Sequence, residues 1–357
     1  MRVELRYSSR VTPTLAILLL LATFTAHAQL PEAILPGPKP PEVPAEWKTW
    51  IGEYGSSFNP IAYVLSEKDE FIWISERAND ARDAHYRILE KFSLHSRPPT
   101  HPAHGMRLKV NQNGTRVLLI GGVGNGKRTP DGNSPQSAQI KPLRPIGQLR
   151  EEALAATPPR ETSTFHKPEL VEVTTLDAKI HLDIRYATSN DFLGTPVYTQ
   201  ARAFLEHPAA EALLRVQKRL QPLGYGLLIH DAYRPWYVTK IFWEATPPQG
   251  KIFVADPTQG SRHNRGCAVD LTLYDLATGL PIEMPGTYDE MSPRSFPDYP
   301  GGTSLQRWHR DLLRRAMKSE GFSVYEAEWW HFDYKDWHDY PILNVPFEKV
   351  NAGNSAN

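Results

Sequence analysis

Two short segments in the second half of the chain concentrate side chains that can bind a metal ion and move protons. They read Ser261-Arg-His-Asn-Arg-Gly-Cys-Ala-Val-Asp270 and Glu328-Trp-Trp-His331. Two imidazoles and one carboxylate form a ligand set that zinc accepts, and a catalytic zinc keeps a fourth position for water. A further carboxylate beside the metal can accept the proton of that water. Metal-assisted hydrolysis is therefore the chemistry that these residue types allow, although each residue alone more often has a hydrogen-bonded or surface role.

A predicted strand over Ala268–Tyr274 would hold Asp270 rigidly on an open face. Side chains alternate between the two faces of a strand. The face expected to point into the core carries Val269, Leu271 and Leu273. Asp270 lies on the opposite face, where a cleft can form.

The other three polar side chains need departures from regular strand geometry to reach that carboxylate. His263 lies seven positions earlier, so an unbroken strand would place it on the wrong face, and Gly266 permits the necessary bend. Glu328 and His331 are three positions apart and would diverge in a regular strand. We therefore predict a turn or bulge over Glu328–Trp330.

The elements that must position these residues mix strands and helices without a clean βαβ repeat, which favours an α+β fold over a doubly wound one. Expected strands cover Ile180–Tyr186, Gly226–Asp231, Ala268–Tyr274 and Trp329–Tyr334, and expected helices cover Ala203–Leu220, Pro235–Glu244 and Ser304–Glu320. Gly321 suits a helix C-cap.

Five motifs in this order resemble the VanX-type D-alanyl-D-alanine dipeptidases, zinc peptidases related to the D,D-carboxypeptidases of cell-wall metabolism. They are Asp183-Ile-Arg-Tyr-Ala-Thr-x-x-Asp-Phe-x-Gly194, Asp231-Ala-Tyr-Arg234-Pro, Ser261-x-His263-x-x-Gly266-x-Ala268-x-Asp270-Leu-Thr-Leu, Gly286-Thr-Tyr-Asp289-x-Met-Ser and Glu328-Trp-Trp-His331-Phe. The resemblance runs from about Glu169 to Tyr340 and does not reach residues 29–165. It implies a zinc D,D-peptidase-like catalytic domain with a central antiparallel sheet.

The resemblance also implies a role for each matching residue. One zinc ion would bind to His263, Asp270 and His331. Glu328 would be the general base that later protonates the leaving amine.

Three further residues acquire roles in the same way. Arg234 would stabilise the tetrahedral oxyanion, although a salt bridge with Asp231 at the start of a helix is the alternative explanation of this arginine. Asp289 would bind the free ammonium of the substrate, and Ser261 would contact the substrate backbone.

Composition limits the partners of the chain. Its 357 residues include 40 Lys and Arg against 40 Asp and Glu, so zero net charge gives no general attraction to nucleic acid or anionic lipid. The single cysteine, Cys267, cannot form an intrachain disulfide. Because it alternates away from Asp270, we interpret it as buried packing.

The chain divides into six predicted segments. They are a signal peptide over 1–28 with cleavage after Ala28, a Pro-rich linker over 29–46, a small β-rich module over 47–127, a polar and Pro-rich linker over 128–168 with a short helix near 148–156, the catalytic domain over 169–345 and a flexible tail over 346–357. The signal peptide predicts a periplasmic or secreted protein without a membrane span after cleavage. The β-rich module could bind the cell wall, shield the cleft or only add a core.

Two other motifs are interpreted as structural. Gly121–Lys127 fits part of a phosphate-binding loop, but Arg128 stands where Ser or Thr would hold magnesium, so a glycine-rich turn is the better interpretation. His101 and His104 lie in a Pro-rich loop without a nearby carboxylate.

Three functions follow as hypotheses. The first is a zinc dipeptidase that hydrolyses D-Ala-D-Ala during peptidoglycan turnover. The second is a D,D-carboxypeptidase or endopeptidase that cuts longer peptidoglycan stem peptides. The third is an inactive, zinc-stabilised wall-binding protein.

Overall fold

The computed structural model describes residues 31–55, 63–77, 86–96, 106–112, 115–120, 125–128 and 139–350. The predicted signal peptide, as well as His101 and His104, lies outside the described residues. Residues 125–127 of the predicted glycine-rich turn belong to strand β7 (Asn125–Arg128), and residues 121–124 are outside the described part. No helix in the described ranges combines the length and apolar character needed to cross a bilayer.

A five-stranded sheet forms the centre of the C-terminal region, in the order β13-β14-β12-β11-β9. The strands are β9 (His181–Leu182), β11 (Tyr225–Asp231), β12 (Ala268–Asp275), β13 (Phe322–Tyr325) and β14 (Glu328–Tyr334). All pairs are antiparallel except β11 with β9, which is parallel. The architecture is thus a mixed α and β fold with an antiparallel sheet, in agreement with the predicted class.

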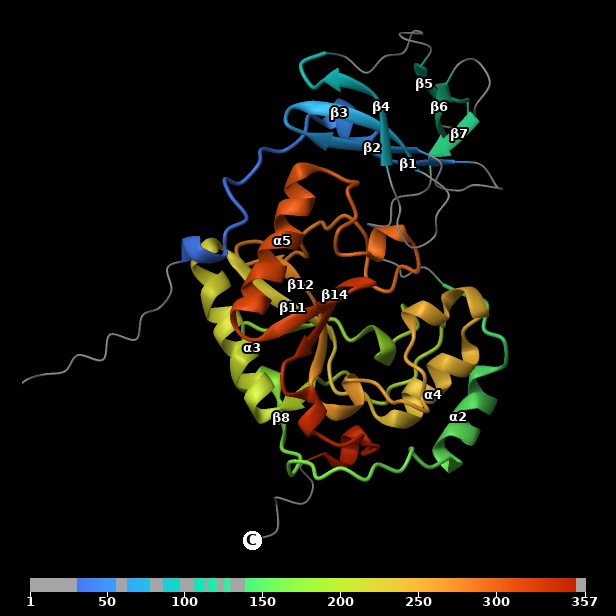
Figure 1. Cartoon of the computed structure of the whole chain (residues 1–357), viewed down its shortest axis with the longest axis vertical. Coiled ribbons are helices and arrows are strands. Elements are labelled where there is room, and N and C mark those ends of the chain that lie inside the picture. Colours follow the sequence, from blue (N-terminus) through green and yellow to red (C-terminus); the bar gives the residue numbers. More distant parts are fainter. Residues whose placement is uncertain are drawn as a thin grey trace, which may run out of the picture.

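One face of this sheet packs against apolar side chains of the main hydrophobic core. The predicted inward residues Val269, Leu271 and Leu273 are fully buried. Helices α3 (His207–Leu220) and α5 (Ser304–Ser319) cover this side, while α2 (Ile146–Ala155) and α4 (Trp236–Ala245) lie on the other side of the sheet (Figure 1). Asp270 belongs to the opposite face, as alternation predicts.

Helices α4 and α5 confirm the predicted ones. Helix α5 begins after Thr303, whose hydroxyl accepts from the Gln306 amide while the Gln306 side chain accepts from the Thr303 amide. This reciprocal cap satisfies two amide groups that a helix leaves unpaired at its N-terminus. Gly321 follows the helix with φ of +89°, as expected for a C-cap glycine.

Two predicted elements differ in the structure. The expected helix over Ala203–Leu220 begins only at His207, because Pro208 has no amide hydrogen to extend it backwards. Residues Phe204–Glu206 instead form β10, which pairs with β8 (Leu170–Glu172). The expected strand over Ile180–Tyr186 is limited to β9, and a 3-10 turn over Arg185–Ala187 follows it.

Parts of the segments predicted as linkers and tail pack into the main core. Helix α2 lies within the predicted linker 128–168 and buries Ile146 and Leu149 in the main core. Ile34 of the predicted linker 29–46 is buried in the same core. Phe347 of the predicted tail is also buried there, and residues 351–357 are outside the described part. Because the composition of these segments is mostly polar and Pro-rich, the burial of these few apolar residues was not predicted.

The described strands between residues 52 and 128 form a separate seven-stranded antiparallel sheet, drawn above α5 in Figure 1. Its order is β4-β3-β2-β1-β7-β6-β5, with β1 (Gly52–Gly55), β2 (Tyr63–Lys68), β3 (Phe71–Arg77), β4 (Tyr86–Ser93), β5 (Met106–Val110), β6 (Arg116–Ile120) and β7 (Asn125–Arg128). Trp47, which precedes the sheet in helix α1 (Ala45–Lys48), is fully buried in the core of this sheet.

Candidate active site

Neighbouring strands and one turn bring the three candidate ligands together. Asp270 on β12 stands directly opposite His331 on β14. His263 lies in a 3-10 turn that ends at Gly266, whose φ is +65°. This left-handed residue makes the predicted bend and returns His263 to the side of Asp270.

A bulge in β14 brings Glu328 and His331 to the same site. Along β13, the partner of Tyr325 is Glu328, but the partner of Val324 is already Phe332. Three residues of β14 are therefore extra at this point, and the predicted bulge is confirmed. Glu328 Oε2 lies 3.9 Å from His331 Nδ1 as a result.

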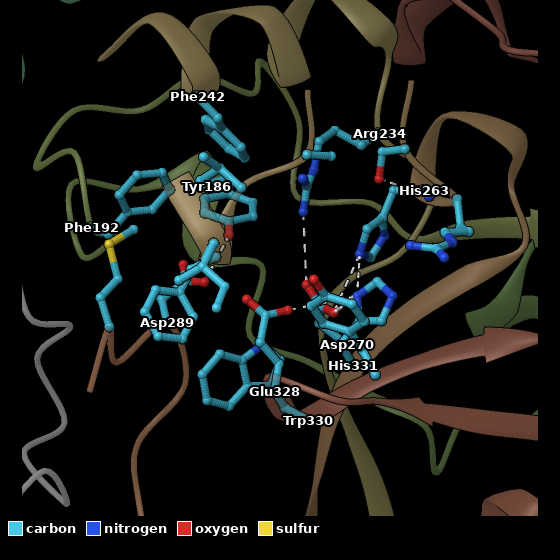
Figure 2. A pocket seen from close by; sticks show the side chains of 18 of the residues that line it. Tyr186, Phe192, Arg234, Phe242, His263, Asp270, Asp289, Glu328, Trp330 and His331 are labelled. Carbon is cyan, nitrogen blue, oxygen red and sulfur yellow. Dashed lines mark hydrogen bonds and ion pairs between the residues drawn. The ribbon is translucent and has the colours of Figure 1, made fainter. Parts of the chain in front are cut away.

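The donor atoms of His263, Asp270 and His331 converge on one point (Figure 2). His331 Nδ1 lies 3.0 Å from both His263 Nε2 and Asp270 Oδ1, and His263 Nε2 lies 3.3 Å from Asp270 Oδ1. Tetrahedral zinc with bonds of about 2.0–2.1 Å separates its ligands by about 3.3–3.4 Å. The three atoms are thus within a few tenths of an ångström of a zinc ligand triangle.

The hydrogen bonds behind the two imidazoles fit a cation at that point. His263 Nδ1 donates to the Ala232 carbonyl at 2.6 Å, and His331 Nε2 donates to Asp333 Oδ1 at 2.9 Å. Each ring therefore turns its other nitrogen toward the Asp270 carboxylate. This is the arrangement that fixes the tautomer of metal-binding histidines.

The pKa of His331 supports the same conclusion. Burial lowers this pKa, but the carboxylates of Asp333 and Asp270 raise it more, to about 10. A positive charge is therefore favoured between these ligand atoms, and either a proton or a metal ion can supply it.

Asp333 is a residue that the sequence analysis missed. It lies two positions after His331 on the same strand, so both side chains share one face. This spacing was visible in the sequence, but an acidic residue beside a histidine is too common to single out.

Glu328 is a buried carboxylate beside the three ligands. Burial, together with the charge of Asp270, raises the pKa of Glu328 to about 8 in spite of the nearby His331 and Arg234. A carboxylate of raised pKa can accept a proton and return it near neutral pH.

Arg234 is buried, and it fits both explanations offered above. Its Nε and Nη2 contact Asp231 Oδ2 at 2.9 and 2.8 Å, so the salt bridge at the start of α4 exists. The same Nη2 lies 3.8 Å from Asp270 Oδ2, and the guanidinium borders the cavity over the ring of Phe242 (Figure 2). Asp231, which Tyr198 also holds at 2.7 Å, thus aims Arg234 at the site.

Asp289 and Ser261 both line this cavity of about 100 Å³. Asp289 Oδ1 accepts from the Tyr186 hydroxyl at 3.0 Å, whereas Oδ2 has no hydrogen-bond partner among the described residues. Burial and the nearby Asp270 raise the pKa of Asp289 well above its usual range. Ser261 Oγ accepts from the His263 amide at 3.2 Å, so this serine also orders the ligand turn.

Cys267 is fully buried, as predicted, and its pKa is raised by burial. It is not part of the group of side chains that could hold the metal ion, which consists of His263, Asp270 and His331.

A buried His–Asp–His group with an adjacent carboxylate and arginine is typical of metal-dependent hydrolases. Residues 166–350 match the family model described as D-ala-D-ala dipeptidase, peptidase family M15. The chain belongs to this peptidase family and is a hydrolase.

Individual relatives agree with the family model. The chain is 36% identical to the D-alanyl-D-alanine dipeptidase of Escherichia coli over 180 residues. This alignment covers 50% of this chain and 91% of the relative. It is 34% identical to the protein of that name from Enterococcus faecium, over 47% of this chain and 97% of the relative. For the Streptomyces coelicolor protein, the identity is 35%, over 48% of this chain and 96% of the relative.

Proposed function

We propose that this protein is a zinc metallopeptidase that hydrolyses the free dipeptide D-Ala-D-Ala. The observation that carries the proposal is the convergence of three metal-ligand atoms within 3.0–3.3 Å of one another, beside the buried carboxylate of Glu328. The substrate follows from the names of the relatives.

Zinc bound to His263, Asp270 and His331 would supply a Lewis acid that polarises the amide carbonyl and acidifies a water molecule. Glu328 accepts the proton of the attacking water and then delivers it to the leaving amine. Its burial supports this role, because a carboxylate of raised pKa is a better proton acceptor and a competent acid near neutral pH.

Arg234 stabilises the negative charge that develops on the carbonyl oxygen. Its guanidinium is fixed before the substrate arrives, since Asp231 holds it through two nitrogens. A donor that is already oriented needs no reorganisation during the reaction, and removing one typically costs about 10²–10³ in rate.

Asp289 binds the ammonium group of the substrate. A buried carboxylate with one oxygen lacking a partner is unfavourable in the free protein, so a cationic ligand relieves the cost. Ser261 contributes to the wall of the same cavity and contacts the substrate backbone. A site that needs a free ammonium selects short substrates, which favours the dipeptide over a longer stem peptide.

The biological setting is proposed from the sequence alone. The signal-peptide pattern over residues 1–28 supports export to the periplasm or the medium. In that compartment, the reaction would serve the recycling of cell-wall fragments.

The test is amine release from D-Ala-D-Ala by purified residues 29–357, with added zinc and with a chelator, beside N-acetyl-D-Ala-D-Ala. We expect cleavage of the free dipeptide only, and its loss with chelator. Cleavage of a longer stem peptide without cleavage of D-Ala-D-Ala would instead support a D,D-carboxypeptidase or endopeptidase. Activity that survives chelation would contradict the metallopeptidase mechanism.

A further inference from the structure

The loop that carries Asp289 connects β12 to α5 and has an unusual backbone. Asp289 has φ of +58°, in the left-handed region that residues other than glycine seldom adopt. Surrounding contacts must maintain such a conformation. The adjacent Glu290 provides them, since its carboxylate accepts from the Thr287 amide at 3.1 Å and from the Ser292 hydroxyl at 2.8 Å.

Arg294 closes the loop from the other end. Its Nε donates to Glu290 Oε1 at 2.6 Å. A Cβ added to Gly286 would lie 2.7 Å from the Arg294 carbonyl oxygen, so the two ends of the loop are in direct contact. The loop thus forms a compact ring around the Glu290 carboxylate.

The N-terminal sheet supplies the next charge in this series. Glu53 of β1 is 1% exposed, and its Oε2 lies 3.2 Å from Nη1 of Arg294. The hydroxyl of Tyr299 donates to the other oxygen of Glu53. A largely buried series of alternating charges therefore runs from Glu53 of β1 through Arg294 to Glu290, the neighbour of Asp289.

A second contact of the same sheet fixes the chain after the loop. Glu67 of β2 accepts from the Ser304 amide at 2.6 Å, and its own amide donates to the Gly302 carbonyl at 3.1 Å. Arg307 of α5 donates to the Glu67 carbonyl at 2.5 Å. The sheet holds the start of α5 here, on the C-terminal side of the loop.

We propose that Glu53 is a positioning residue for substrate binding, acting through Arg294 and Glu290 to hold Asp289 where it meets the substrate ammonium. This inference rests on the proposed function of Asp289. The N-terminal sheet then takes part in substrate recognition without touching the substrate. Without the Glu53 charge, Arg294 loses a carboxylate partner, and the ring around Glu290 loosens.

The experiment compares steady-state kinetics of the zinc-loaded protein on D-Ala-D-Ala for wild type, Glu53→Gln, Asp289→Asn and the double variant. We expect Glu53→Gln to raise KM about tenfold while kcat stays within about twofold, because ammonium binding is affected and the metal site is not. The double variant should have the KM of Asp289→Asn alone, since residues that act through one contact are not additive.

Two further variants serve as control and as reserve. Tyr299→Phe removes a hydrogen bond to the same Glu53 carboxylate but leaves Arg294 paired, and its KM should stay within about twofold of wild type. Glu290→Gln breaks the series inside the loop without touching the N-terminal sheet, so it should repeat the effect of Glu53→Gln and replaces that variant if it does not fold.

The outcomes separate this inference from the proposed function. A wild-type protein without activity on D-Ala-D-Ala, or an Asp289→Asn variant with wild-type KM, overturns both. A raised KM in Asp289→Asn with wild-type KM in Glu53→Gln and Glu290→Gln overturns only the role of Glu53. If the KM increases of Glu53→Gln and Asp289→Asn multiply in the double variant, the role of Glu53 is also overturned. Glu53 would then act on something other than Asp289.

Discussion

Three of the side chains that face the proposed metal ion or substrate are each held by another polar group. His263 is oriented by the Ala232 carbonyl, His331 by Asp333 and Arg234 by Asp231. The sequence motifs and the family resemblance predicted these inner residues. Of these three partners, only Asp231 was considered in advance, since a carboxylate or a carbonyl behind a histidine has no distinctive sequence pattern.

Replacing Glu328 tests the proton transfer. Glu328→Gln keeps the shape of the side chain but cannot accept a proton, so kcat should fall by about 10²–10⁴. The bound zinc should remain stoichiometric, which metal analysis of the purified variant checks. The matched control is Glu326→Gln, an exposed residue two positions away that should keep wild-type kcat. Near-wild-type turnover by Glu328→Gln would exclude this residue as the general base.

Replacing Asp333 tests the support of His331. Asp333→Asn retains an oxygen that can accept from His331 Nε2 but removes the charge that favours a cation at Nδ1. The affinity for zinc should fall about 10–100-fold, as measured by competition with a chromogenic chelator. Asp339→Asn removes the same charge from an exposed position nearby and should leave the affinity unchanged. Equal affinities in both variants would contradict a role for Asp333.

At the scale of elements, local sequence signals predicted the longer strands and helices. Side-chain alternation indicated β12, Pro235 indicated the start of α4 and an amphipathic pattern indicated α5. The short elements were missed or misplaced, because two- to four-residue strands such as β9, β10 and β13 are determined by their partners in the sheet and carry little pattern of their own. The bulge in β14 was predictable only because the chemistry required Glu328 and His331 to meet.

The turn before β12 can be tested at Gly266. Gly266→Ala should destabilise the fold and lower zinc occupancy. Besides the strained φ, its Cβ would lie 2.6 Å from Leu170 Cδ2 and 3.3 Å from the Glu206 amide nitrogen. Gly279→Ala is the matched control, since Gly279 has φ of +73° but open space around a Cβ. Gly279→Ala should lower the free energy of unfolding by about 1–2 kcal/mol through backbone strain alone, and its zinc occupancy should stay complete.

Chemical denaturation and metal analysis of the two variants distinguish the effects. Gly266→Ala should lose more stability than Gly279→Ala and should bind less than one zinc per chain. Equal losses and full occupancy in both would show that the bend at Gly266 does not position His263.

At the scale of the whole molecule, the contact between the N-terminal sheet and the loop after β12 was beyond prediction. Glu53 and Tyr299 are 246 positions apart, and single polar residues so distant in sequence carry no signal of pairing. The buried apolar residues in the segments predicted as linkers were not predicted for a similar reason. Each of them is a single apolar residue in a mostly polar stretch.

Global stability should depend on pH through Glu206, the last residue of β10. Burial raises the pKa of Glu206 from 4.5 to about 7. The folded state therefore binds a proton more tightly than the unfolded state, so stability falls as pH rises through this window. Glu206→Gln lacks this titrating group. Its free energy of unfolding should therefore fall less between pH 5 and pH 8 than that of wild type.

Thermal unfolding of the two proteins at both pH values measures this difference. The exposed Glu151→Gln, on α2, should follow the wild-type pH dependence. Parallel curves for Glu206→Gln and wild type would show that Glu206 does not contribute to it.

The two histidines of the proposed metal site are 68 positions apart, and His331 is the last of the three ligands to be synthesised. A nascent chain that has not yet reached β14 lacks one ligand and the opposite strand that aligns Asp270 with it. Metal capture must therefore follow completion of the C-terminal hairpin. If the chain is exported unfolded, the zinc supply of the compartment in which it folds, rather than that of the compartment in which it is translated, determines the fraction of loaded enzyme.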